Sequence, residues 1–160
     1  GALVDAMLSG GGTLRLCNRI KALGVETGLF NWDQYASIGA AIRALPATTK
    51  VVVGGTSLGA NEAPRVASHV YPRKIDFLFG IQPSLYGVKN LVPSNARRAM
   101  YFYSPWWWPV TLGFGAYQWQ RNPANTSTVM LPRQTFLPHP GDNAESVHKP
   151  ILDEIAKLLK

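Results

Sequence analysis

One serine stands where a strand is expected to end and a helix to begin. Ser57 lies in Gly55-Thr-Ser-Leu-Gly59, which fits the G-x-S-x-G pattern of a nucleophile elbow. The preceding stretch, Lys50 to Val53, carries three valines and is closed by glycine, as is typical of a short strand buried on both faces. Small residues two before and two after the serine let the backbone turn tightly. The pattern therefore predicts an exposed Ser57 hydroxyl and a Leu58 N–H directed at an oxyanion.

A serine hydroxyl is a poor nucleophile unless a base lies within hydrogen-bonding reach, and the chain has three histidines. His69 is expected on the helix that leaves the elbow, roughly 18 Å from the serine, as a residue of the surface or the helix end. His139 follows the last predicted strand in a loop, which is where a base for an elbow serine is best placed. His148, near the first turn of the last helix, is the alternative base, or else a solvent-exposed helix residue.

The catalytic acid is not identified by the sequence. No carboxylate lies between Asp76 and Asp142. Asp142, three residues after His139, and Asp33, after an earlier predicted strand, are the two candidates, and a Ser-His pair without an acid is the third possibility. Because loss of the orienting acid can reduce turnover by about 10⁴, a weak enzyme is one expected outcome.

Strands and helices alternate around these residues with short connections. This order predicts an α/β fold with a mostly parallel sheet of about five strands and helices on both faces. Pro64 lies inside one expected helix, and its missing N–H counts against a regular helix there. The predicted elements are helices at 13–23 (with Thr13 as N-cap), 34–45, from Ser57 to about Val70, and 147–159, and strands at 25–30, 50–53, 75–81, 98–104 and 126–131.

Composition narrows the class of protein. The 160 residues, with 46% hydrophobic and 16% charged side chains, indicate a single folded domain over 1–160. No apolar run is long enough for a membrane span and no signal peptide is evident, so the location is unmarked and cytoplasmic by default. Cys17 is expected to be a small core residue on a helix. The net charge of +7 comes from scattered Lys and Arg, so no nucleic-acid partner is predicted. No spacing of ligand residues indicates a metal, and no cofactor is expected.

The elbow segment, a late histidine loop and a terminal helix, in that order, resemble the α/β-hydrolase superfamily of esterases, lipases and thioesterases. The resemblance implies a three-layer sandwich that hydrolyses a small acyl ester or thioester, with Ser57 as nucleophile and His139 as base. Gly1-Ala-Leu, with Ser9-Gly-Gly-Gly12 before a helix, resembles the loop that lends a second oxyanion N–H in that superfamily, which places Gly1 and Ala2 at the oxyanion hole. The strand that precedes this loop in the family is missing, so the chain is either a fragment or an abridged member. If Ala2 to Leu8 form that strand, the donor moves toward Ser9–Gly12.

One stretch departs from the family pattern, and two other classes of function stay open. Where relatives carry the acid, this chain has Ser104-Pro-Trp-Trp-Trp-Pro109. Trp106, Trp107 and Trp108 are candidates for a hydrophobic acyl-binding wall or a lid, or for core residues under a long loop. One alternative is a binding or assembly module on the same fold, inactive or weakly active. The other is a nucleotide-binding, doubly wound domain that uses the Gly54–Gly59 loop. The sequence fixes neither the substrate nor the oligomeric state.

Overall fold

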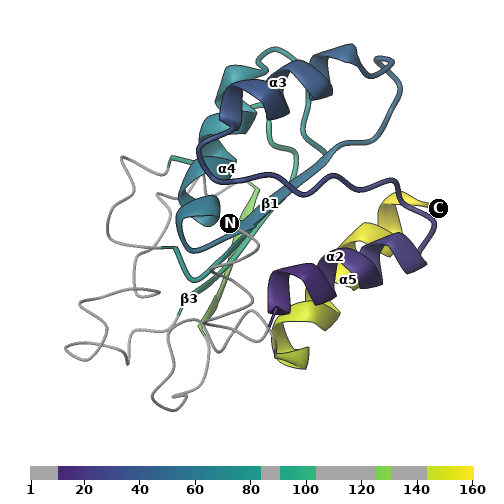
Figure 1. The fold of residues 1–160 in the computed structure, drawn as a ribbon, viewed down its shortest axis with the longest axis vertical. Coiled ribbons are helices and arrows are strands. Elements are labelled where there is room, and N and C mark those ends of the chain that lie inside the picture. The colour runs from purple at the N-terminus through teal and green to yellow at the C-terminus, as the bar shows by residue number, and fades with distance from the viewer. Residues whose placement is uncertain (1–10, 84–90, 104–124, 131–143) are drawn as a thin grey trace.

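The fold is a parallel sheet with helices on both faces (Figure 1). The computed structural model describes residues 11–83, 91–103, 125–130 and 144–160. In these ranges four strands pair in chain order, and every neighbouring pair is parallel. The strands are β1 (Val52–Thr56), β2 (Phe77–Ile81), β3 (Ala99–Tyr103) and β4 (Thr126–Met130). The predicted α/β class is confirmed, with four described strands against about five expected.

Of the helices in the described ranges, two cover each face of the sheet, which gives three layers (Figure 1). Helices α3 (Tyr35–Ala44) and α4 (Leu58–His69) lie on one face, and α2 (Gly12–Ala22) and α5 (Glu145–Leu158) lie on the other. The helices were all expected within about two residues of these bounds.

Side chains along the interior strands alternate between the two faces of the sheet, so the hydrophobic core has two parts. Leu78 and Tyr101 point to the α3/α4 face, whereas Phe77, Phe79 and Phe102 point to the α2/α5 face. Successive side chains of a strand point to opposite faces, so a strand buried on both faces is apolar throughout. Strands β2 and β3 are the interior strands of the described sheet, as their composition predicted.

Two predictions about secondary structure were wrong. Residues 25–30 form no strand, because a strand needs a neighbour for its backbone groups and no described segment pairs with them; Leu29 and Phe30 are exposed. Pro64 does not interrupt α4, which runs through it to His69. The neighbours of Pro64 on the inner side of this helix, Ala63 and Ala67, are buried in the α3/α4 core, so tertiary packing outweighs the missing hydrogen bond.

Candidate active site

Ser57 joins β1 to α4 in a strained backbone conformation. Its φ is 56° and its ψ is −118°, which an L-residue rarely adopts and which costs of order 1–3 kcal/mol. Hydrogen bonds hold the turn: the Ser57 N–H donates to the Ile81 carbonyl at 2.9 Å, and the Ser57 carbonyl accepts from the N–H of Ala60 at 3.0 Å. The predicted sharp turn from strand to helix at Ser57 is present.

The two glycines of the motif have different roles. A Cβ on Gly55 would lie 2.3 Å from the carbonyl carbon and the carbonyl oxygen of Gly59, both backbone atoms. A Cβ on Gly59 would meet nothing within 4 Å. The close approach of strand and helix therefore requires glycine at position 55, and the expectation that position 59 must also be small for the turn to form was wrong.

The Ser57 hydroxyl does not cap the helix that follows it. Serine is among the preferred N-cap residues because its oxygen accepts from an N–H of the first turn, yet α4 has no side-chain cap. The side chain is half-buried, and the Leu58 N–H lies in the first turn of α4, where backbone N–H groups lack intrahelical acceptors. The positive end of the helix dipole at this turn favours an anion beside Ser57.

The amino end of α2 lies beside the same turn. Thr13 Oγ1 and Thr56 Oγ1 are 2.8 Å apart, although 43 residues separate them in sequence. Helix α2 begins at Gly12, after Gly11 in the left-handed region with φ 77°. Thr13 therefore lies in the first turn of α2 and is not the N-cap that the sequence suggested. Gly11 and Gly12 directly precede Thr13, the residue that contacts Thr56 before the serine.

Gln82 is a second strained residue at this edge of the sheet, and sequence reasoning missed it. Among the described residues, Ser57 and Gln82 are the two non-glycine residues with positive φ, and Gln82 has φ 48°. Thr56 is in register with Ile81, so the two residues follow adjacent strand ends. Gln82 is 1% exposed, and its N–H donates to the Phe102 carbonyl at 2.7 Å. No sequence signal marks it, since a residue before proline is ordinarily extended.

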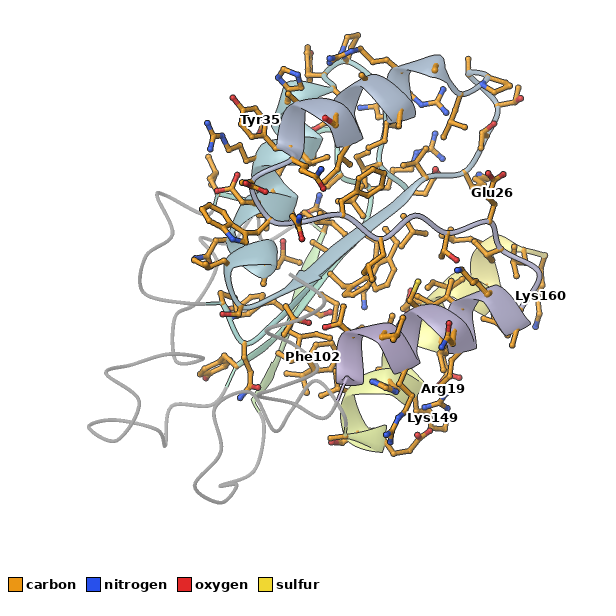
Figure 2. All side chains as sticks on the ribbon, in the orientation of Figure 1. Arg19, Glu26, Tyr35, Phe102, Lys149 and Lys160 are labelled. Carbon is orange, nitrogen blue, oxygen red and sulfur yellow. The ribbon has the colours of Figure 1, made fainter. Side chains whose placement is uncertain are left out.

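His148 is buried against α2. Its ring is 1% exposed, so the solvent-exposed alternative was wrong. Nδ1 lies 3.2 Å from Nη1 of Arg19, and because a guanidinium only donates, Nδ1 is the acceptor and the ring proton is on Nε2. Arg19 also donates to both carboxylate oxygens of Glu145 at 2.6 and 3.0 Å. This hydrogen bond lowers the pKa of Glu145 and raises the pKa of Arg19. Figure 2 shows Arg19 of α2 beside the first turns of α5, near Lys149.

The other residues predicted from the sequence divide into two groups. Asp33 lies in an exposed turn before α3 and forms no ion pair within the described ranges. His69 is the exposed last residue of α4, and Cys17 is buried on α2, both as expected. The remaining site residues lie outside the described residues: Ala2 with Gly1, Ser9 of the Ser9–Gly12 alternative, Trp106, Trp107, Trp108, His139 and Asp142.

Three further findings bear on the class of protein. Comparisons with protein-family models, with curated proteins and with solved structures gave no match to this chain. Over the ranges that the structure describes, no three His, Cys, Asp or Glu side chains converge to hold a metal. No described helix has both the length and the apolar character to span a membrane.

Proposed function

We propose that the protein is a serine hydrolase that cleaves a carboxylic ester or thioester, with Ser57 as its nucleophile. The backbone of Ser57 carries the proposal: a non-glycine residue is strained between a strand and a helix, and its hydroxyl is not used as a cap. A turn with a purely structural role would not need serine at this position, because glycine adopts this conformation without backbone strain. Backbone strain of this kind clusters at active sites, and here Gln82 adds a second strained residue at the adjacent strand end.

The proposed reaction is acyl transfer to serine followed by hydrolysis. Ser57 Oγ attacks the acyl carbonyl while His139 takes its proton, and the Leu58 N–H at the amino end of α4 stabilises the oxyanion. The bond between Thr13, in the first turn of α2, and Thr56 supports the Ser9–Gly12 alternative for the second donor. His139 then returns the proton to the leaving alcohol or thiol, and water releases the acid by the reverse steps. Asp142 is the proposed orienting acid, and Trp106 to Trp108 are the proposed acyl-binding wall.

His139 is favoured over His148 as the base because of the hydrogen bond that His148 makes. A base must gain a proton during attack, and the Nδ1 of His148 already accepts from the cationic Arg19. With Nδ1 accepting from Arg19 and the ring proton on Nε2, neither ring nitrogen of His148 has a vacant lone pair for the serine proton. Asp33 is disfavoured as the acid because its carboxylate is exposed in a turn, where water competes for the histidine.

A fluorophosphonate probe tests the nucleophile directly. The wild type should be labelled, Ser57→Ala should not, and Ser68→Ala, which removes an exposed hydroxyl at the far end of α4, should be labelled like the wild type. His139→Ala should slow labelling by about 10²-fold or more, whereas His69→Ala should leave it unchanged. Equal labelling of the wild type and Ser57→Ala would refute the nucleophile.

The nucleotide-binding alternative is disfavoured by the same geometry. Gly54 and Gly55 lie inside strand β1, so the segment from Gly54 to Gly59 is not a loop that could wrap a phosphate. The inactive binding module on this fold stays as the second candidate, because no described carboxylate is positioned as an acid. It predicts no turnover of a series of chromogenic acyl esters. Robust turnover that disappears in His139→Ala would reject it.

A further inference from the structure

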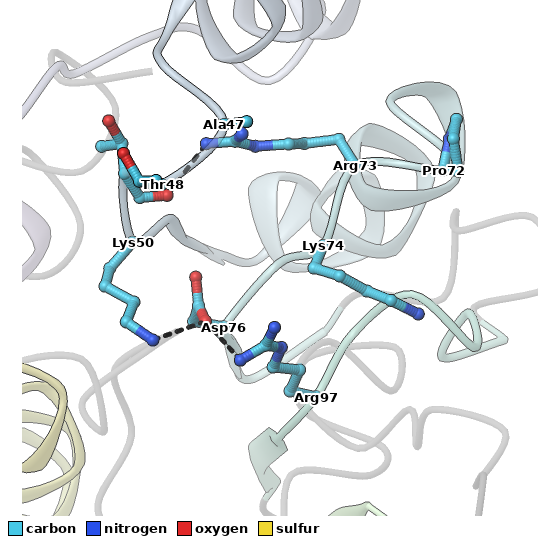
Figure 3. Close-up of a pocket in the computed structure, with 9 residues that line it drawn as sticks. Ala47, Thr48, Lys50, Pro72, Arg73, Lys74, Asp76 and Arg97 are labelled. Carbon is cyan, nitrogen blue, oxygen red and sulfur yellow. Dashed lines mark hydrogen bonds and ion pairs between the residues drawn. The ribbon is translucent and has the colours of Figure 1, made fainter.

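A basic pocket lies at the edge of the sheet opposite Ser57. It has a volume of about 430 Å³ and is formed by residues that precede β1, β2 and β3, whereas Ser57 follows β1. Figure 3 shows its lining, which consists of Ala47, Thr48, Thr49, Lys50, Pro72, Arg73, Lys74, Asp76 and Arg97. This site is separate from the proposed active site.

The single carboxylate of the pocket is already engaged. Asp76 is buried, and its Oδ2 accepts the Val51 N–H at 2.9 Å. Its Oδ1 lies 3.7 Å from Lys50 Nζ and 3.4 Å from Arg97 Nη1 (Figure 3). The side chains of Lys50 and Arg97 are 55% and 59% exposed, and each has N–H donors beyond the one that faces Asp76. Both cations can therefore bind a further anion without leaving Asp76.

The other two cations, Arg73 and Lys74, form no ion pair with any carboxylate that the structure describes. Arg73 Nη2 donates to the carbonyls of Pro46 and Thr49, both at 2.8 Å, and its buried Nε has no hydrogen-bond partner. Carbonyl oxygens satisfy donors but leave the guanidinium charge uncompensated. Lys74 is exposed and has no partner within the described ranges. The pocket thus holds four cations and one carboxylate, an excess of three positive charges.

We propose that this pocket binds a small anion that carries two phosphate groups. A terminal phosphate bears about −1.5 to −2 charge near pH 7, so a diphosphate matches the excess of three, whereas a single carboxylate does not. Guanidinium and ammonium groups are the usual phosphate-binding groups, and Thr48 and Thr49 add hydroxyl donors at the rim. The volume is within the range of pockets for small molecules. Because Lys50, Arg73, Lys74 and Arg97 all line one hollow, a small anion fits better than an extended nucleic acid.

Calorimetric titration with sodium pyrophosphate at constant ionic strength tests the proposal. The wild type should bind, and Lys74→Glu should bind at least about tenfold more weakly. Within the described ranges Lys74 makes no hydrogen bond or ion pair that the substitution would remove, so this variant should fold. Lys21→Glu is the matched control, since it makes the same charge change at an exposed position near the end of α2, and it should bind like the wild type. Arg97→Gln, which leaves Lys50 and Val51 on Asp76, should also weaken binding.

Parallel titrations identify the source of the phosphates. Orthophosphate should bind more weakly than pyrophosphate. Tighter binding of ADP than of pyrophosphate would support a nucleotide diphosphate as the ligand, and equal binding would support free diphosphate. Absence of pyrophosphate binding by the wild type would overturn the proposal. An equal loss of pyrophosphate affinity in Lys74→Glu and Lys21→Glu would also overturn it, because it would indicate diffuse electrostatic attraction. Tighter binding of a single-stranded oligonucleotide than of either diphosphate would overturn it for the same reason.

Discussion

The variants Gly55→Ala and Gly59→Ala should have opposite effects on the stability of the protein. A methyl group at position 55 would meet the backbone carbonyl of Gly59 at 2.3 Å, far inside contact distance. Backbone atoms in the first turn of α4 cannot move aside as a flexible side chain can, so β1 and α4 must separate. Overpacking of this kind costs about 3 kcal/mol, a large part of the roughly 5–15 kcal/mol that stabilises a domain.

A methyl group at position 59 has open space around it. Gly59 is the second residue of α4, and alanine there reduces the conformational entropy of the unfolded chain and favours the helix. Gly59→Ala should therefore stabilise the protein by about 0.5–1 kcal/mol. The two variants make the same chemical change four residues apart, so each is the control for the other.

Urea unfolding followed by far-UV circular dichroism measures both effects. For an m-value of about 2 kcal/mol/M, the midpoint should fall by about 1.5 M in Gly55→Ala and rise by about 0.3–0.5 M in Gly59→Ala. Labelling by a fluorophosphonate should disappear in Gly55→Ala and persist in Gly59→Ala. A Gly55→Ala midpoint equal to that of the wild type would refute the close approach of strand and helix, and with it the geometry assigned to the elbow.

Three further predictions concern Ser57, Asp76 and Glu145. Ser57→Gly should be about 1 kcal/mol more stable than Ser57→Ala in urea unfolding, because glycine relieves the backbone strain that alanine keeps; equal stabilities would argue against strain. Asp76→Asn should lower the free energy of unfolding by about 1–3 kcal/mol, because it weakens the hydrogen bond from the Val51 N–H and removes the ion pairs with Lys50 and Arg97; an unchanged urea midpoint would contradict this. Bonding to Arg19 lowers the folded-state pKa of Glu145 below its ordinary 4.5, so its contribution to stability is present above that pH and lost as the pH falls through the lowered pKa. The urea midpoints of the wild type and Glu145→Gln should accordingly differ most near neutral pH and converge in acid; a difference that is constant with pH would contradict the ion pair.

Local patterns in the sequence predicted the main elements, because short apolar runs and helical periodicity are properties of neighbouring residues. The strand at Phe77–Ile81, the helix after Ser57 and the turn between strand and helix were all expected. The basic pocket was not, since Lys50, Asp76 and Arg97 converge only through the register of three parallel strands. That register depends on tertiary packing, which a single sequence does not specify.

The same limit explains the errors at single residues. Gln82 was not singled out from the sequence, because a residue before proline is ordinarily extended, whereas in the fold it has positive φ and its N–H bonds the Phe102 carbonyl of β3. Residues 25–30 have the composition of a strand, but composition does not determine whether a neighbouring strand is present to bond their backbone groups. Thr13 has the side chain of an N-cap, and it is used instead for a hydrogen bond to Thr56. In each case the outcome depended on whether a segment distant in sequence makes a contact, which local composition does not specify.

The distribution of helices over the two faces has a consequence for the order of folding. Helices α3 and α4 follow one another around β1, so their face is built from contacts that are close in sequence. The other face joins α2 to α5, and its bond from Arg19 to Glu145 spans 126 residues. Contacts between distant residues form late, because a long loop must close first. During synthesis we therefore expect Phe77, Phe79 and Met100 to be covered by α2 alone until α5 leaves the ribosome, which leaves part of this aromatic face open to aggregation until then.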